Sequence, residues 1–171
     1  MTKTLLSFGH GYSARALTRI LLPQDWRVIG TTRSEDRAVT LMNEGTEPRI
    51  WPGANMEPAL NAATHLLISA APDENGDPVL GALGDEIAKR AGQFEWVGYL
   101  STTGVYGDHA GDWVTEETPL TPATKRGIAR VNAEAAWAAI PNLPLHIFRL
   151  AGIYLPLIHI SEPTRLRRTS Y

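Results

Sequence analysis

Short runs of apolar residues alternate along the chain with segments in which apolar residues recur every three or four positions. The short runs predict β-strands, and the longer period predicts amphipathic helices. We expect strands over residues 4–8, 27–31, 49–51, 65–69, 96–100 and 144–150. We expect helices over residues 12–22, 34–43 (with Ser34 as the cap), 56–62, 79–90 and 123–139. The fold class is therefore predicted as α/β, a doubly wound parallel sheet whose right-handed crossovers favour the strand order 3-2-1-4-5-6.

The turn after the first predicted strand carries the pattern Gly9-x-Gly11-x-x-Ala14, which is the Rossmann dinucleotide-binding fingerprint. Gly9 permits a tight turn, Gly11 lets the backbone approach a pyrophosphate, and Ala14 allows close packing of helix on strand. The backbone N–H groups of Tyr12 and Ser13 begin the next helix and are the expected phosphate ligands. The alternative is that the glycines only shape a turn in an unrelated α/β fold.

The histidines predict no metal site. His10, His65, His109 and His146 are scattered along the chain, and no ligand spacing recurs among them. His10 lies inside the glycine pattern, where we expect it to be exposed and assign it no role.

Composition narrows the classes of partner. The chain has 171 residues, a formal net charge of -2 and no cysteine. The charge gives no reason to expect nucleic acid or an anionic membrane as a partner, so a small-molecule substrate is expected. We find no signal-peptide pattern and no apolar run of the ~18 residues that a membrane span needs. A cytoplasmic protein is therefore expected, while the oligomeric state is left open.

The end of the second predicted strand bears on the choice of cofactor. An NAD-binding Rossmann fold usually has an acidic residue there, about 20 residues after the glycines, to bind the ribose 2′-hydroxyl. This chain has Thr31-Thr32-Arg33-Ser34 at that place. Arg33 suits a 2′-phosphate, so we expect NADP to be preferred over NAD. The alternative is that Arg33 is an ordinary solvated surface residue.

Two further segments, residues 100–107 (LSTTGVYG) and 148–154 (FRLAGIY), carry a family resemblance together with the glycine loop. The chain resembles the extended short-chain dehydrogenases/reductases, the NAD-dependent epimerase/dehydratase group, and is most similar to their atypical, YeeZ-like members. The resemblance covers residues 3–154. It implies a nicotinamide cofactor bound to a Rossmann domain.

The resemblance also implies catalytic positions, and here the chain departs from the pattern. The residue that hydrogen-bonds the substrate oxygen corresponds to Thr102. The positions of the family's Tyr-x-x-x-Lys pair hold Arg126 and Arg130, and no Tyr-x-x-x-Lys occurs in the chain. An arginine stays protonated and cannot cycle a proton as the tyrosine does, although Arg130 can still contact ribose or phosphate.

Three functions are open at this point. The first is an NAD(P)-dependent oxidoreductase or epimerase acting on a small carbonyl, sugar or alcohol. The second is a non-catalytic NAD(P)-binding sensor or scaffold, which the missing pair favours. The third is an unrelated methyltransferase or nucleotide-binding domain, which the 100–107 motif disfavours.

The C-terminal segment breaks the family pattern. Family members continue after the 148–154 motif into a Gly-Pro-Gly loop, a seventh strand and a substrate lobe. Here residues 157–165 resemble a translated sequencing adapter, so we interpret 1–154 as the NAD(P)-binding domain and 155–171 as a non-native tail. The substrate lobe is then missing from this sequence, and we expect the 171-residue chain to be inactive and prone to association through Leu145, Ile147 and Ile153.

Overall fold

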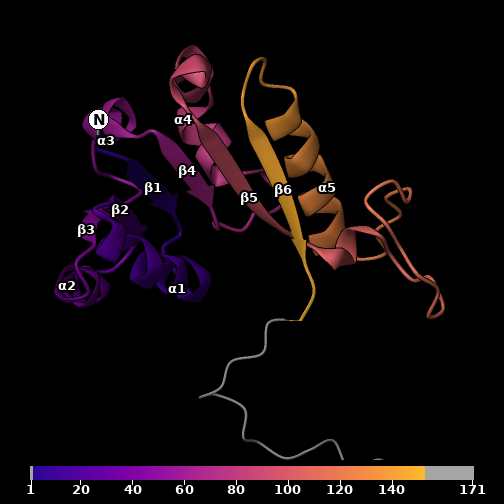
Figure 1. The fold of residues 1–171 in the computed structure, drawn as a ribbon. Helices are drawn as coiled ribbons and strands as arrows, with labels where there is room; N and C mark the ends of the chain where they lie inside the picture. Colours follow the sequence, from indigo (N-terminus) through magenta and orange to yellow (C-terminus); the bar gives the residue numbers. More distant parts are fainter. Residues whose placement is uncertain (1, 153–171) are drawn as a thin grey trace, which may run out of the picture.

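The computed structural model describes residues 2–152, which form one six-stranded parallel sheet in the order β3-β2-β1-β4-β5-β6 (Figure 1). The predicted fold class and strand order are confirmed. The strands are β1 (Thr4–Phe8), β2 (Arg27–Thr32), β3 (Glu47–Ile50), β4 (His65–Ile68), β5 (Trp96–Thr102) and β6 (Leu145–Leu150). Ile153, Tyr154 and the proposed tail lie outside the described residues.

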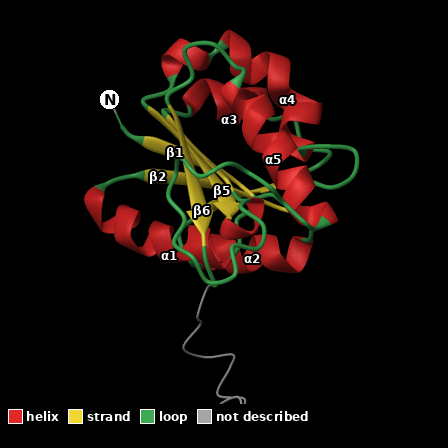
Figure 2. Cartoon of the chain, turned by 90° about the vertical axis from the view of Figure 1, so that its right-hand side faces the viewer, coloured by secondary structure: helices red, strands yellow, loops and turns green. Residues whose placement is uncertain are grey.

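Helices cover both faces of the sheet. They are α1 (Tyr12–Leu21), α2 (Glu35–Asn43), α3 (Glu57–Ala62), α4 (Pro78–Lys89) and α5 (Lys125–Ala138), with 3-10 turns η1 (Leu22–Gln24), η2 (Ala91–Gln93) and η3 (Thr103–Val105). Figure 2 shows α1 and α2 on one face of the sheet and α3, α4 and α5 on the other. We call these the α1 face and the α5 face. Among residues 2–152, no helix combines the length and apolar character that crossing a bilayer requires.

Most predicted elements are found within one or two residues of their predicted bounds, and side-chain caps account for two of the boundaries. Ser34 caps α2 as expected, because its hydroxyl accepts a hydrogen bond from the backbone N–H of Arg37 (3.2 Å). Thr124 caps α5 by accepting from the N–H of Gly127 (3.0 Å), so this helix begins at Lys125 rather than at residue 123.

Strand β3 begins two residues earlier than the predicted start at residue 49. Its Glu47 pairs with Ile29 of β2, and the Glu47 carboxylate forms an ion pair with Arg27 (2.7 Å). A charged residue at a sheet edge interrupts the apolar pattern, which is why periodicity alone missed it.

The larger core lies between the sheet and the helices of the α5 face. Its fully buried members include Leu6, Phe8, Leu66, Tyr99 and Trp137. Leu145 and Ile147 are partly buried against this core. The most exposed apolar side chain of β6 is instead Phe148, which is 41% exposed.

Candidate functional site

The glycine loop lies where the strand order reverses. Strand β1 is flanked by β2 on one side and by β4 on the other, and the chain leaves β1 through residues 9–11 into α1. In open α/β sheets this reversal leaves a crevice at the carboxyl ends of the strands, where ligands bind. The fold therefore places the predicted phosphate loop at the expected ligand position.

Gly9 is required by the path of the backbone. Its φ is +73°, and a Cβ at this position would lie 2.8 Å from the backbone nitrogen of Ala70, which follows β4. The Gly9 N–H donates to the Thr31 hydroxyl of β2 (2.8 Å). The loop is thus held between β2 and β4, with no space for a side chain.

Gly11 differs, because nothing among residues 2–152 requires its lack of a side chain. A Cβ there would meet only the Gly9 carbonyl oxygen, at an ordinary 3.7 Å, and its φ of −91° is accessible to any residue. Gly11 precedes the first turn of α1, whose N–H groups have no side-chain cap. The surface over Gly11 is therefore open to a ligand, and backbone donors stand beside it.

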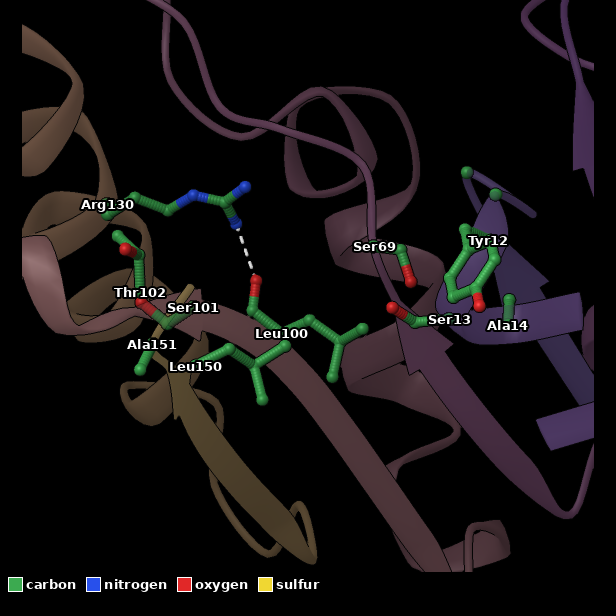
Figure 3. A pocket seen from close by; sticks show the side chains of 12 residues that line it. Tyr12, Ser13, Ala14, Ser69, Leu100, Ser101, Thr102, Arg130, Leu150 and Ala151 are labelled. Carbon is green, nitrogen blue, oxygen red and sulfur yellow. Dashed lines mark hydrogen bonds between the residues drawn. The ribbon is translucent and has the colours of Figure 1, made fainter. Parts of the chain in front are cut away.

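A pocket of about 370 Å³ opens over this loop (Figure 3). Figure 3 shows Tyr12, Ser13 and Ser69 on one side of it and Thr102 and Arg130 on the other. Its lining consists of Gly9, Gly11, Tyr12, Ser13, Ala14, Ser69, Leu100, Ser101, Thr102, Arg130, Leu150 and Ala151. All the predicted site residues except Arg33 meet in this one pocket.

Ser69 is a pocket residue that sequence reasoning missed. Its hydroxyl oxygen is buried and has no hydrogen-bond partner among residues 2–152. A buried polar group without a partner is uncommon in folded proteins and signals a ligand or water at that position. The sequence feature that could have identified Ser69 is a hydroxyl residue directly after the most apolar strand, β4.

Arg130 brings a positive charge to the carboxyl end of β5. Its guanidinium donates to the Leu100 carbonyl oxygen (2.7 Å) and to the Tyr99 hydroxyl (3.1 Å), and lies 5.6 Å from the centre of the Tyr99 ring. Burial raises the pKa of Tyr99 to about 12, against the opposing effect of Arg130. Tyr99 therefore stays protonated at neutral pH and helps to hold the arginine in place.

Thr102 ends β5 at the far side of the pocket from Gly11. Its hydroxyl oxygen accepts from the N–H of Gly104 (3.2 Å), which caps η3. The hydroxyl proton remains available for a second partner, so Thr102 can donate a hydrogen bond into the pocket.

A buried polar network supports this end of the sheet, and sequence reasoning did not identify it. Glu134 of α5 is 4% exposed, accepts from the Ser101 hydroxyl (2.5 Å) and forms an ion pair with Arg149 of β6 (2.8 Å). Arg149 also donates to the Tyr106 hydroxyl (2.9 Å) and to the Glu116 carbonyl (3.2 Å). The hydrogen bonds to Glu134 raise the pKa of Arg149. The network fixes α5 and β6 around the strand end that presents Thr102.

Three residues occupy positions outside the pocket lining. Arg33 and Arg126 are exposed, and within residues 2–152 neither contributes to the lining. His10 was expected to be exposed, and that expectation is wrong, because the residue is only 6% exposed. Its side chain turns away from solvent and packs over Gly30 of β2.

No protein-family model matches the chain, and no curated protein matches it. Among solved structures, a functionally unknown conserved protein from Silicibacter pomeroyi is 65% identical. It has a TM-score of 0.86, and the match covers 90% of this chain and 54% of that one.

Two more distant structures share the fold. A UDP-glucuronic acid 4-epimerase from Bacillus cereus, in complex with NAD, is 15% identical with a TM-score of 0.72, covering 88% of this chain and 57% of that one. The Bordetella bronchiseptica enzyme WbmG, in complex with NAD and UDP, is 21% identical with a TM-score of 0.66, covering 87% and 53%. The chain thus spans about half the length of these proteins and has their Rossmann-like fold.

Proposed function

We propose that this chain forms the cofactor-binding half of a nicotinamide-dependent oxidoreductase or epimerase that acts on a small carbonyl, sugar or alcohol. The observation that carries the proposal is the single pocket at the strand-order reversal. Uncapped N–H groups beside the open Gly11 form one wall, and Thr102 and Arg130 form the opposite wall. The NAD named with the Bacillus cereus epimerase and with the Bordetella bronchiseptica enzyme WbmG supports the same ligand class.

The residues present fit a dinucleotide. The first turn of α1 and the bare Gly11 backbone would hold the pyrophosphate, and the unpartnered Ser69 hydroxyl would gain a partner from the ligand. Arg130 would hold a ribose or phosphate oxygen at the other wall. When bound, the nicotinamide ring supplies hydride transfer.

Thr102 is the proposed catalytic residue of this chain. Its hydroxyl would donate a hydrogen bond to the substrate oxygen attached to the carbon that is oxidised or reduced, and so would orient that oxygen in the pocket. Arg126 stands at the place of the family's tyrosine but is exposed and stays protonated, so it cannot move the proton. Proton transfer therefore needs another group. In this proposal, residues of the longer protein outside this sequence would supply it.

Calorimetric titration of the chain with NAD and NADP tests the site. In Gly11→Val the added side chain would occupy the space above the loop, so we expect affinity to fall at least about tenfold, the effect of losing one good hydrogen bond. Gly81→Val is the matched control, because a Cβ at Gly81 also meets nothing within 4 Å but lies in α4, outside the pocket lining. Unchanged binding by Gly11→Val would contradict the assignment.

We further propose that Arg33 favours NADP over NAD. It is exposed just beyond the end of β2, where no acidic residue stands to bind a 2′-hydroxyl. An exposed arginine–phosphate pair contributes about 1 kcal/mol or less, so Arg33→Ala should narrow the NADP-to-NAD affinity ratio severalfold. The exposed Arg126→Ala is the control and should leave the ratio unchanged. Tighter binding of NAD than of NADP by the parent would refute the preference.

The second candidate is a non-catalytic NAD(P)-binding sensor or scaffold. It is favoured because Arg126 and Arg130 stand at the positions of the family's catalytic Tyr–Lys pair. A turnover assay on the longer protein, with a panel of carbonyl, sugar and alcohol substrates, separates the two functions. Cofactor binding without turnover of any member would favour the sensor. Turnover that Thr102→Val lowers would favour the enzyme.

A further inference from the structure

His10 lies between the two glycines of the phosphate loop, yet its side chain faces the protein interior. Its backbone N–H donates to the Thr31 carbonyl oxygen of β2 (3.0 Å). A Cβ at Gly30 of β2 would lie 2.7 Å from His10 Cγ and 2.8 Å from Nδ1, so the imidazole occupies the space that a side chain at position 30 would need. The large residue in the loop and the small residue in the strand are therefore complementary.

The contacts of His10 favour one tautomer of its imidazole. The Thr18 hydroxyl donates its one proton to the Ala14 carbonyl (2.9 Å), and the same oxygen lies 3.3 Å from His10 Nε2. The tautomer that satisfies both contacts carries the hydrogen on His10 Nε2, which donates it to Thr18 and leaves Nδ1 unprotonated. Nδ1 is buried and has no partner among residues 2–152.

These contacts connect the phosphate loop to two elements at once. The backbone N–H groups of residues 9 and 10 are hydrogen-bonded to Thr31 of β2. The imidazole of His10 is hydrogen-bonded to Thr18 of α1. The first turn of α1 supplies the donors that face the pocket. A loop held in its binding conformation before the ligand arrives pays less conformational entropy on binding.

We propose that His10 is a positioning residue for the dinucleotide: as the neutral Nε2–H tautomer it wedges the phosphate loop against Gly30 and Thr18 and so holds the pocket donors in place. The ligand part of this inference rests on the proposed function. The wedge itself is a property of the chain alone. The two parts can therefore be tested separately.

Hydrogen exchange in the absence of ligand tests the wedge. His10→Leu keeps an apolar side chain of similar bulk but removes the Nε2 donor, and His10→Gln restores an amide donor near the Nε2 position. We expect the hydrogen-bonded amides of Gly9 and Arg15, which donate to the Thr31 hydroxyl and the Gly11 carbonyl, to exchange about tenfold faster in His10→Leu, the effect of losing one hydrogen bond, and near the parent rate in His10→Gln. Amides of residues 66–68 in β4 are the internal reference. Equal exchange in all three proteins would overturn the inference.

Titration with NAD and NADP tests the positioning role. We expect His10→Leu to weaken binding of the better cofactor about tenfold and His10→Gln to restore it to within about threefold. Thr46→Ala is the matched control for destabilisation alone, since Thr46 is buried beside the same Gly30 position but is not part of the loop. It should lower the melting temperature without changing the affinity.

The outcomes separate the two proposals. Absence of binding by the parent would count against the proposed function, while the exchange experiment would still decide the wedge. Parent-like affinity in a folded His10→Leu variant would refute the positioning role. A loss of affinity in Thr46→Ala as large as in His10→Leu would show a general effect of stability, and would also refute it.

Discussion

The two faces of the sheet are built differently. On the α5 face, three helices cover the strands, and side chains such as Trp137 and Tyr99 are fully buried. On the α1 face, α1 packs over β1, β2 and β4, where Leu5 and Leu67 are buried. Farther along the same face, residues that include Phe148 border an apolar hollow of about 480 Å³.

The α5 face contributes mainly to stability, whereas the α1 face carries the proposed binding loop. Apolar burial contributes about 25 cal/mol for each Å² removed from water, so the α5 face holds the larger share of the folding free energy. The α1 face packs less extensively and carries the helix that presents the phosphate loop. The matches cover only 54% and 57% of two solved structures of this fold.

The largest expected effect is on the α5 face. Trp137 is 0% exposed and packs beside Tyr99, with ring centres 6.3 Å apart. Trp137→Ala should lower the free energy of unfolding by about 3–5 kcal/mol, measured by urea denaturation. Trp113→Ala is the control, because Trp113 is 98% exposed and its removal should change little. A loss below about 1 kcal/mol for Trp137→Ala would contradict the ranking of the faces.

The buried ion pair of the α5 face ranks next. Glu134→Gln keeps the shape of the side chain but leaves the Arg149 charge unpaired, and the Arg149 side chain is 19% exposed. We expect a loss of about 2–4 kcal/mol in urea denaturation, somewhat reduced by this exposure. Glu47→Gln breaks an exposed pair with Arg27 and should cost less than about 1 kcal/mol. Equal losses at the two sites would show that burial is not the deciding factor.

Acid should weaken the α1 face through His10. Burial lowers the pKa of His10 to about 4, from 6.5 in an exposed histidine. The unfolded chain therefore takes up a proton first, so the stabilisation is complete above pH 6.5 and is lost as the pH falls to about 4. At about 1.4 kcal/mol per pH unit, the maximum loss is on the order of 3 kcal/mol.

The matched variant for this pH experiment is His10→Gln, which lacks the titrating group. Unfolding free energies measured from pH 7 to 4.5 should fall more steeply in the parent than in the variant. His65, whose pKa burial also lowers, contributes equally to both proteins and cancels in the difference. Parallel curves would contradict a buried neutral His10.

The smallest effect on stability is expected at the uncovered part of the α1 face. Phe148→Ser should lower the unfolding free energy by only about 1–2 kcal/mol, because Phe148 is already 41% exposed and only its remaining burial is lost. It should also reduce self-association in size-exclusion chromatography, because an exposed apolar patch promotes association. The same replacement at Val97, which is 0% exposed on the α5 face, should cost about 2–3 kcal/mol. Unchanged elution of Phe148→Ser would show that this surface does not drive association.

The sequence alone determined the order of elements, the sheet topology and the position of the phosphate loop. These features depend on local patterns: apolar period, capping residues such as Ser34, and two glycines placed between a strand and a helix. Gly9 could be assigned its role from spacing, because a tight turn after β1 has only a few solutions. Thr102 and Arg130 were placed by resemblance and do line the same pocket.

Only the tertiary structure decided which way the remaining polar side chains face. His10 is buried because Gly30, twenty residues later in the chain, leaves room for it. Glu134 is buried because Arg149 and Ser101 reach it from two neighbouring strands. The environment of such a side chain is set by residues far away in sequence. Local periodicity carries no information about these distant residues. Whether such a side chain is buried is therefore decided only when the strands and helices pack together.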